Sequence, residues 1–283
     1  MIHKEGYIQS QDKLQLFYQH WLPESAMKAQ VFLIHGFSEH SGRYSQWAKK
    51  FVNHNIGVFA MDLRGHGKSD GQRGHTPSFG HMLNDVERFI SQFRSNQDIP
   101  GILYGQSLGG NLVLNYSLNN NTKLVHGIIS TSPWLRLVTE PKTIIALGAR
   151  IIRKIAPKFS RNAGLDINLL SHDPAVAEAY ATDQLNHSRI TPNLFFGTKH
   201  AANIIFKHHA HFALPILLMH GNGDKVTSFN ASEKLARLAQ KNGTDLTFIP
   251  WNDLFHELHN ENGNDRIFHS ILDWIRTKFD VHL

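Results

Sequence analysis

The chain has 283 residues, of which 41% are hydrophobic and 18% charged, so it can bury a large core and has the composition of a soluble globular protein. It contains no cysteine, which excludes disulfides, a cysteine nucleophile and thiolate metal sites. The net charge is +6, but the basic residues are scattered without a Lys/Arg block, so the sequence predicts no nucleic-acid partner.

The N-terminal residues contain no apolar stretch of the kind found in a Sec signal peptide. No apolar run approaches the roughly 20 residues that cross a bilayer. We therefore expect a cytoplasmic protein, in which any membrane contact is peripheral.

Strand and helix patterns alternate along most of the chain. Two alternating strands are expected at 6–10 and 13–21. Continuous apolar runs predict buried strands, and they are followed by helical patterns; the strands are expected at 30–36, 57–63, 101–105, 125–131, 216–221 and 246–251, and the helices at 44–54, 79–94, 108–118, 228–241 and 264–279. This order predicts a mostly parallel central sheet flanked by helices on both sides.

The alternation stops once, between Pro133 and about Ala213. This segment has no buried-strand run but has helix-like pieces at 143–156 and 174–185. It is too long for a plain loop in a compact domain. We interpret it as an inserted helical lid at 133–213, which divides a core made of residues 1–132 and 214–283.

Ser107 is the candidate nucleophile. It lies in the sequence Gly-Gln-Ser-Leu-Gly at 105–109, after a predicted strand and before a predicted helix. A serine on such a sharp turn exposes its hydroxyl above the sheet, next to the free N–H groups of the helix N-terminus. A glycine-rich turn with a chance serine is the alternative, which the strand and helix on either side make much weaker. The oxyanion hole is expected to use the backbone N–H groups of Leu108 and of Phe37, in the loop after the third strand.

A serine hydroxyl needs an imidazole base, held by an acid, and after such a turn these follow in the order acid, then base. Asp224, on a glycine-flanked loop after the strand at 216–221, is the candidate acid. Its alternative role is that of a turn or N-cap residue. His256 and His259 both follow the last strand, so position alone leaves the base open between them.

Together these motifs resemble the monoacylglycerol lipase and lysophospholipase family of the α/β-hydrolases. The matching segments are 35–44 (HGFSEHSGRY), 62–71 (DLRGHGKSDG), 105–110 (GQSLGG), Asp224 and 255–261 (FHELHNE). The resemblance implies the α/β-hydrolase fold and assigns His256 as the base. It also supports Phe37 and Leu108 as oxyanion donors. The polar residues of 39–44 are expected to brace the oxyanion loop. Gln106 departs from the histidine that the family often carries there.

The resemblance implies a serine ester hydrolase that acts on a single-acyl lipid, a monoacylglycerol or a lysophospholipid, with no metal and no organic cofactor. The alternatives are a short-chain esterase or peptidase on the same scaffold, and a non-catalytic binding protein that kept the fold. The partner we expect is therefore a small lipid ester.

The predicted helix at 143–156 is mostly apolar, with Arg150, Arg153 and Lys154 clustered near its end. One interpretation is a lid helix that packs on its own domain and has a solvated basic edge. The other is a helix whose apolar face enters a lipid surface while the basic edge meets anionic headgroups. The second interpretation predicts weak peripheral membrane contact through the lid.

Overall fold

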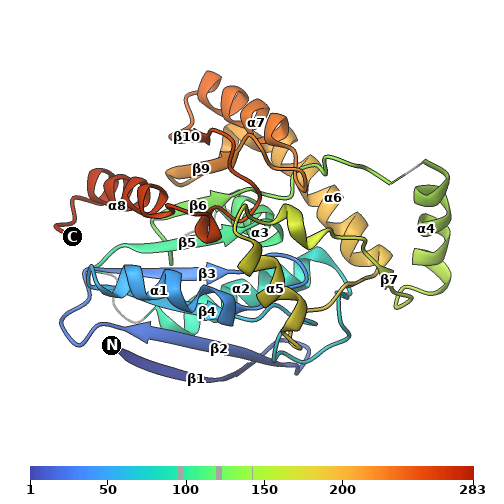
Figure 1. Ribbon diagram of the computed structural model, residues 1–283, viewed down its shortest axis with the longest axis horizontal. Coiled ribbons are helices and arrows are strands. Elements are labelled where there is room, and N and C mark those ends of the chain that lie inside the picture. Colours follow the sequence, from blue (N-terminus) through green and yellow to red (C-terminus); the bar gives the residue numbers. More distant parts are fainter. Residues whose placement is uncertain (95–97, 119–122, 142) are drawn as a thin grey trace.

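A computed structural model of the protein describes residues 1–94, 98–118, 123–141 and 143–283. Within these residues an eight-stranded sheet has the order β1-β2-β4-β3-β5-β6-β9-β10. β1 and β2 are antiparallel to their neighbours, and the other strands run parallel (Figure 1). The strands are β1 Ile2–Gln9, β2 Gln15–Leu22, β3 Ala29–Ile34, β4 Ile56–Met61, β5 Gly101–Gln106, β6 Gly127–Thr131, β9 Ile216–Gly221 and β10 Leu246–Trp251.

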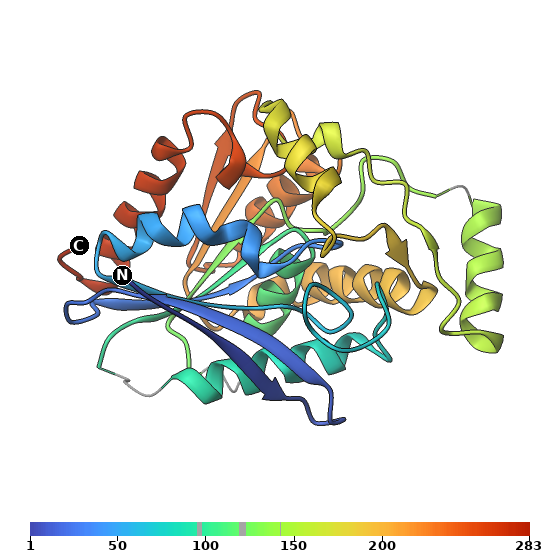
Figure 2. The ribbon, with the colours of Figure 1, turned by 60° about the horizontal axis from the view of Figure 1, so that its bottom comes forward.

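Helices cover both faces of this sheet, which explains why the parallel strands read as continuous apolar runs. In β3, Val31 and Leu33 lie in one of the two apolar layers beside the sheet, and Phe32 and Ile34 lie in the other. Figure 2 shows the sheet between these layers. The helices are α1 Ser45–Val52, α2 Phe79–Phe93, α3 Leu108–Ser117, α7 Phe229–Lys241 and α8 Asp265–Phe279.

Between β6 and β9 the chain leaves the strand–helix alternation. It forms the helices α4 Thr143–Ile155, α5 Pro174–Thr182 and α6 Pro192–His208, and a short antiparallel pair of β7 Arg161–Asn162 and β8 Arg189–Ile190. α6 packs against α3, and both views show α4 at the edge of the molecule beyond α6 (Figures 1 and 2).

The predicted elements agree with the structure apart from their ends, one helix and one short strand pair. The first strand begins earlier than expected and the second begins later, at 2–9 and 15–22, because their register is set by pairing with each other. The pair of β7 and β8 was not expected from the sequence, and neither was α6. Its start carries a recognisable signal, since Thr191 caps the helix through its side chain and Pro192 occupies the first turn.

Candidate active site

Ser107 lies in the tight turn between β5 and α3, as its position between a predicted strand and helix indicated. Its backbone has φ 55° and ψ −111°, a left-handed conformation that is strained for any residue with a side chain. The chain can turn so sharply because Gly105 and Gly109 have none. A Cβ on Gly105 would lie 2.2 Å from the Gly109 carbonyl oxygen, and one on Gly109 would lie 2.1 Å from that of Ile34.

Asp224 and His256 follow the neighbouring parallel strands β9 and β10, so both lie at the carboxyl edge of the sheet. His256 Nδ1 is 2.8 Å from Asp224 Oδ2, and both side chains are buried. The other carboxylate oxygen, Oδ1, accepts the backbone N–H groups of Val226 at 2.7 Å and Thr227 at 3.0 Å. These bonds fix the carboxylate with one oxygen toward the imidazole.

The surroundings of this pair favour its charged forms. Burial disfavours the imidazolium of His256, but the negative charge and hydrogen bond of Asp224, with smaller contributions from Glu257 and Glu39, outweigh it and raise the pKa of His256 above its ordinary 6.5. Burial also opposes ionisation of Asp224. The charge of His256 and the hydrogen bonds from His220 and His256 outweigh this effect and hold the pKa of Asp224 well below its usual range.

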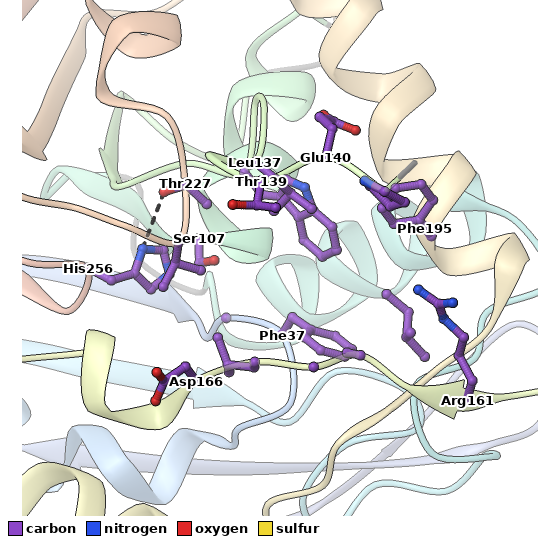
Figure 3. A pocket seen from close by; sticks show the side chains of 18 of the residues that line it. Phe37, Ser107, Leu137, Thr139, Glu140, Arg161, Asp166, Phe195, Thr227 and His256 are labelled. Atoms are coloured by element: carbon purple, nitrogen blue, oxygen red, sulfur yellow. Dashed lines mark hydrogen bonds between the residues drawn. The ribbon is translucent and has the colours of Figure 1, made fainter. Parts of the chain in front are cut away.

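Ser107 and His256 line the same cavity, whose volume is about 610 Å³. In Figure 3 both lie toward one end of it, with Phe195 and Arg161 toward the other. No hydrogen bond joins the Ser107 hydroxyl to the His256 ring among the described residues, and in such enzymes this bond is often long until substrate binds. Most of the wall is apolar and comes from 134–196, including Trp134, Leu137, Ile145, Ile152, Phe159, Phe195 and Phe196.

The loop that follows β3 presents Phe37 to this cavity. In the described part of the chain, the backbone N–H groups of Phe37 and Leu108 donate to no other protein group. Leu108 is fully buried at the first position of α3, next to Ser107, and is not among the residues that line the cavity. Ser38, which follows Phe37, has a positive φ of 71°, and its carbonyl accepts a 2.7 Å hydrogen bond from the Tyr180 hydroxyl.

Buried charges brace the loop that contains Phe37, which is the candidate oxyanion loop. Glu39 accepts the backbone N–H of Gly36 at 2.6 Å and the Tyr44 hydroxyl at 2.9 Å. Arg43 donates to Glu39 at 2.7 Å through Nη1. Its two terminal nitrogens, Nη1 and Nη2, also donate to the two carboxylate oxygens of Glu257, each at 2.7 Å. Burial opposes ionisation of Glu257, but Arg43 outweighs it and lowers the pKa of Glu257 to about 2. Glu257 directly follows His256, so one guanidinium joins the oxyanion loop to the loop that carries the imidazole.

Gln106 also holds the His256 loop, a contact that no local sequence pattern indicates. The Gln106 amide nitrogen donates to the His256 carbonyl oxygen at 2.9 Å, and its amide oxygen accepts the Thr131 hydroxyl at 2.5 Å. The residue beside the candidate nucleophile is therefore tied to the main chain of the candidate base. An imidazole at position 106 could offer the same donor and acceptor pair.

His259, the other candidate base, lies away from Asp224 in the aromatic core. Its ring stacks on Tyr44, with centroids 4.4 Å apart and planes 14° apart, and lies against Trp47. Burial lowers the pKa of His259 to about 4, so the ring is neutral at physiological pH. This environment fits a packing role.

α4 has two apolar faces rather than one. Ile145 and Ile152 line the cavity, although Ile145 is also 42% exposed, whereas Leu147, Ile151 and Ile155 are 53%, 63% and 77% exposed. Arg150, Arg153 and Lys154 of the basic edge are all exposed. Arg150 lies over the Phe196 ring at 5.8 Å, and Arg153 donates to Asn193 at 2.9 Å. Both arginines thus contact α6 while remaining exposed, and contact of the basic edge with lipid headgroups stays a prediction.

Within the described ranges, no group of three or more His, Asp or Glu side chains is arranged to hold a metal ion. Likewise, none of the helices described is both long and apolar enough to cross a membrane.

The sequence from residue 25 to residue 263 matches a protein-family model described as serine aminopeptidase, S33. The chain belongs to this family of α/β-hydrolases. It is 26% identical to a monoacylglycerol lipase of Mycolicibacterium smegmatis over 93% of each chain. It is 27% identical to the phospholipase YtpA of Bacillus subtilis, over 85% of this chain and 92% of that protein. An uncharacterized abhydrolase domain-containing protein of Dictyostelium discoideum is 32% identical over 95% of this chain, which spans only 28% of that protein's length.

Solved structures agree with this assignment. The monoacylglycerol lipase of Paleococcus ferrophilus superposes with a TM-score of 0.81 at 27% identity, covering 98% of this α/β-hydrolase and 100% of that chain. A soluble variant of the Saccharomyces cerevisiae monoglyceride lipase has a TM-score of 0.88 at 21% identity, covering 99% and 96% of the two chains. The eight-stranded, mostly parallel sheet flanked by helices is therefore the α/β-hydrolase fold that the sequence predicted.

Proposed function

We propose that this α/β-hydrolase cleaves the carboxylic ester of single-acyl lipids, either monoacylglycerols or lysophospholipids. The observation that carries the proposal is the cavity of about 610 Å³, which brings Ser107 and His256 together at one end of a long apolar wall. Each methylene moved from water to such a wall contributes roughly 0.8 kcal/mol, so a single long acyl chain gains several kcal/mol by binding there. Relatives that act on monoacylglycerols and phospholipids support the same substrate class.

In this proposal the Ser107 hydroxyl attacks the ester carbonyl carbon, and His256 takes the proton through Nε2. His256 then protonates the leaving alcohol, and the acyl-enzyme forms. A water then gives a proton to His256 and attacks the acyl carbonyl; as the bond to Ser107 breaks and the fatty acid leaves, His256 returns the proton to Ser107 Oγ. Asp224 holds the imidazole at Nδ1 and stabilises its charged form. No metal or organic cofactor takes part in these steps.

The negative charge that develops on the carbonyl oxygen needs donors that are already in place. We assign this role to the backbone N–H groups of Phe37 and Leu108, which have no other acceptor among the described protein groups. Such donors are each worth roughly 3 kcal/mol in the transition state. The bonds that Glu39 makes to Gly36 and Tyr180 makes to Ser38 hold Phe37 from both sides.

We further propose that residues 133–213 act as the lid over this cavity and that α4 makes the weak membrane contact. On its outer side, Leu147, Ile151 and Ile155 follow one another at intervals of about one helical turn and are largely exposed. We call these three residues the outer apolar ridge. Because Arg150 and Arg153 already contact α6, we expect the outer apolar ridge to contribute more to this contact than attraction between the basic edge and anionic headgroups.

The test is covalent labelling by a fluorophosphonate, followed by hydrolysis rates on four substrates: a long-chain monoacylglycerol, a lysophospholipid, a short-chain ester and an amino-acid anilide. We expect labelling of the wild-type protein and the highest kcat/KM on one of the single-acyl lipids. Ser107→Ala should lose labelling and all measurable hydrolysis without loss of fold. The matched control, Ser117→Ala, removes a buried hydroxyl at the other end of α3 and should retain both.

The same panel separates the alternatives. A preference for the short ester or the anilide would replace the lipid substrate with that of an esterase or peptidase. Absence of labelling in the folded wild-type protein would indicate a binding protein that kept the fold, and hydrolysis by Ser107→Ala would contradict the nucleophile.

A further inference from the structure

A second imidazole lies on the far side of the candidate acid. His220, near the end of β9, has its Nε2 2.9 Å from Asp224 Oδ2, the same oxygen that faces His256 Nδ1 at 2.8 Å. On its other side, His220 Nδ1 is 2.8 Å from the hydroxyl of Ser232 in α7. The side chains of His220 and Asp224 are both 0% exposed. His220 does not line the cavity, so it cannot touch a substrate there.

The hydrogen-bonding pattern fixes where the protons lie. Asp224 is ionised and offers only lone pairs, so His220 Nε2 and His256 Nδ1 must each carry the hydrogen that points to Oδ2. With its hydrogen on Nε2, the His220 ring can accept the Ser232 hydroxyl hydrogen at Nδ1. The donors therefore run from Ser232 to His220 to Asp224 Oδ2, where they meet the bond that His256 donates.

We propose that His220, oriented by Ser232, is a positioning residue that acts on the base through Asp224. It holds Oδ2 at the position where His256 needs it and takes up part of the negative charge of the carboxylate. The inference rests on the proposed ester hydrolysis, because the effect is read through the base of that reaction.

Two consequences distinguish this role from packing alone. Two backbone N–H groups and the Thr227 hydroxyl still hold the carboxylate after His220 is lost, but Oδ2 loses one of the donors that place it against the imidazole. The rate of the chemical step therefore falls while substrate binding is unaffected. A carboxylate with one donor fewer keeps more charge for the imidazolium, so His256 gains its proton at a higher pH. The base must be neutral to accept the Ser107 proton, and activity is then lost at a higher pH as the solution is acidified.

The other groups around the pair stay constant in the test. They belong to the loops after β3, β9 and β10 and comprise Glu39, Arg43, Lys225, Glu257 and His259. A change at position 220 leaves these charges as they are, so a shift in the pH profile reports the bond to Asp224.

The experiment measures kcat and KM between pH 5 and 9 on a soluble p-nitrophenyl ester for wild type, His220→Leu, His220→Gln and Ser232→Ala. We expect His220→Leu to lower kcat by about 10-fold with KM within about twofold, and to move the acid limb up by about 0.5–1 pH unit. His220→Gln keeps a donor near the Nε2 position and should recover most of the lost kcat and most of the shift in the acid limb. Ser232→Ala should lower kcat and raise the acid limb as His220→Leu does, but by less.

Two controls complete the test. His20→Leu removes a half-buried histidine in β2, remote from Asp224, and should leave kcat and the acid limb unchanged. In an Asp224→Asn background, His220→Leu should cost less than about twofold, because the two changes remove the same interaction.

An unmoved acid limb in Ser232→Ala and in any folded His220→Leu would overturn the inference, as would full additivity with Asp224→Asn. Failure of the proposed function is recognised separately, since the wild-type protein would then show no turnover on the ester. A lower melting temperature with an unmoved pH profile would assign His220 to packing alone, against the proposal.

Discussion

The two ends of the cavity are built on opposite principles. Around Asp224 and His256 the polar side chains are buried, and hydrogen bonds from distant parts of the chain hold them in one geometry. Around α4 the wall is apolar, and its outer residues are open to solvent. The first region can lose little without losing the chemistry, because a buried polar group without its partner is costly. In the second region, substitutions of exposed residues should cost little stability, and in the proposed function this region selects the substrate.

This comparison is tested most sharply by replacing, one at a time, the two histidines in the loop after β10. His256→Ala should lower kcat by about four to six orders of magnitude, because the proton acceptor of Ser107 is gone. His259→Ala should keep measurable turnover but lose about 2–4 kcal/mol of unfolding free energy, because it opens a cavity beside Tyr44 and Trp47. Ester hydrolysis and urea denaturation measure the two effects. The reverse pattern would make His259 the base.

A second pair tests the acid. Asp224→Asn should lower kcat by about four orders of magnitude and preserve the fold. Because burial opposes the imidazolium and Asp224 is the charge that raises the pKa of His256 above 6.5, its removal should also move the acid limb of any residual activity to lower pH. Asp253→Asn is the control: this residue is exposed, and its backbone N–H bonds Asn222. A severe loss in Asp253→Asn would show that the acid is misplaced.

Gln106 offers a smaller test within the buried region. Gln106→Leu removes the donor to the His256 carbonyl and should lower kcat about 10-fold, the equivalent of one hydrogen bond of about 1.4 kcal/mol, with KM little changed. Gln106→His, the residue common in the family, should keep more activity than Gln106→Leu. Equal rates for all three proteins would mean that this bond does not position the base.

The smallest effect is expected on the outside of the lid. Leu147→Asp with Ile151→Asp should lower hydrolysis of a vesicle-presented lipid several-fold and leave a soluble short ester within about twofold. Ile145→Asp with Ile152→Asp is the matched pair on the cavity side, and it should impair both substrates because charge enters the acyl wall. If the outer pair impairs both substrates equally, α4 is structural and makes no membrane contact.

Vesicle sedimentation gives a second measurement of the same contact. Because the ridge is apolar and its neighbouring arginines face α6, binding of the wild-type protein should depend only weakly on salt. A steep loss of binding at high salt would indicate that basic side chains carry the contact.

Much of the site could be predicted because each of its groups follows a largely apolar strand of the parallel sheet, although β10 at the edge is only half-buried. The apolar runs before Ser107, Asp224 and His256 place all three at the same edge of a parallel sheet, which is a consequence of topology. The choice between His256 and His259 needed the family resemblance, since both follow β10 and only the three-dimensional structure places His256 against Asp224 and His259 against Tyr44.

The bonds that tune the site could not be predicted. Gln106 and the His256 carbonyl are 150 residues apart in sequence, and no local pattern joins them. The direction of α4 was also hidden, because a helix with apolar residues on two sides does not tell which side meets its own protein. α6 was missed although Thr191 and Pro192 mark its start.

The bond between Tyr180 and Ser38 limits how the cavity can open. It fastens α5 to the oxyanion loop, while the amides of Asn111 and Asn115 in α3 donate to carbonyls of α6. A swing of the whole inserted segment would break these bonds and disturb Phe37 with them. Opening is therefore expected to be local: α4 moves between two hinges, the bridge from Leu137 to Thr227 and the pairing of β7 with β8. Amide hydrogen exchange should then be fast in α4 and slow in α5 and α6, so that substrate entry and alignment of the catalytic groups are separate kinetic events.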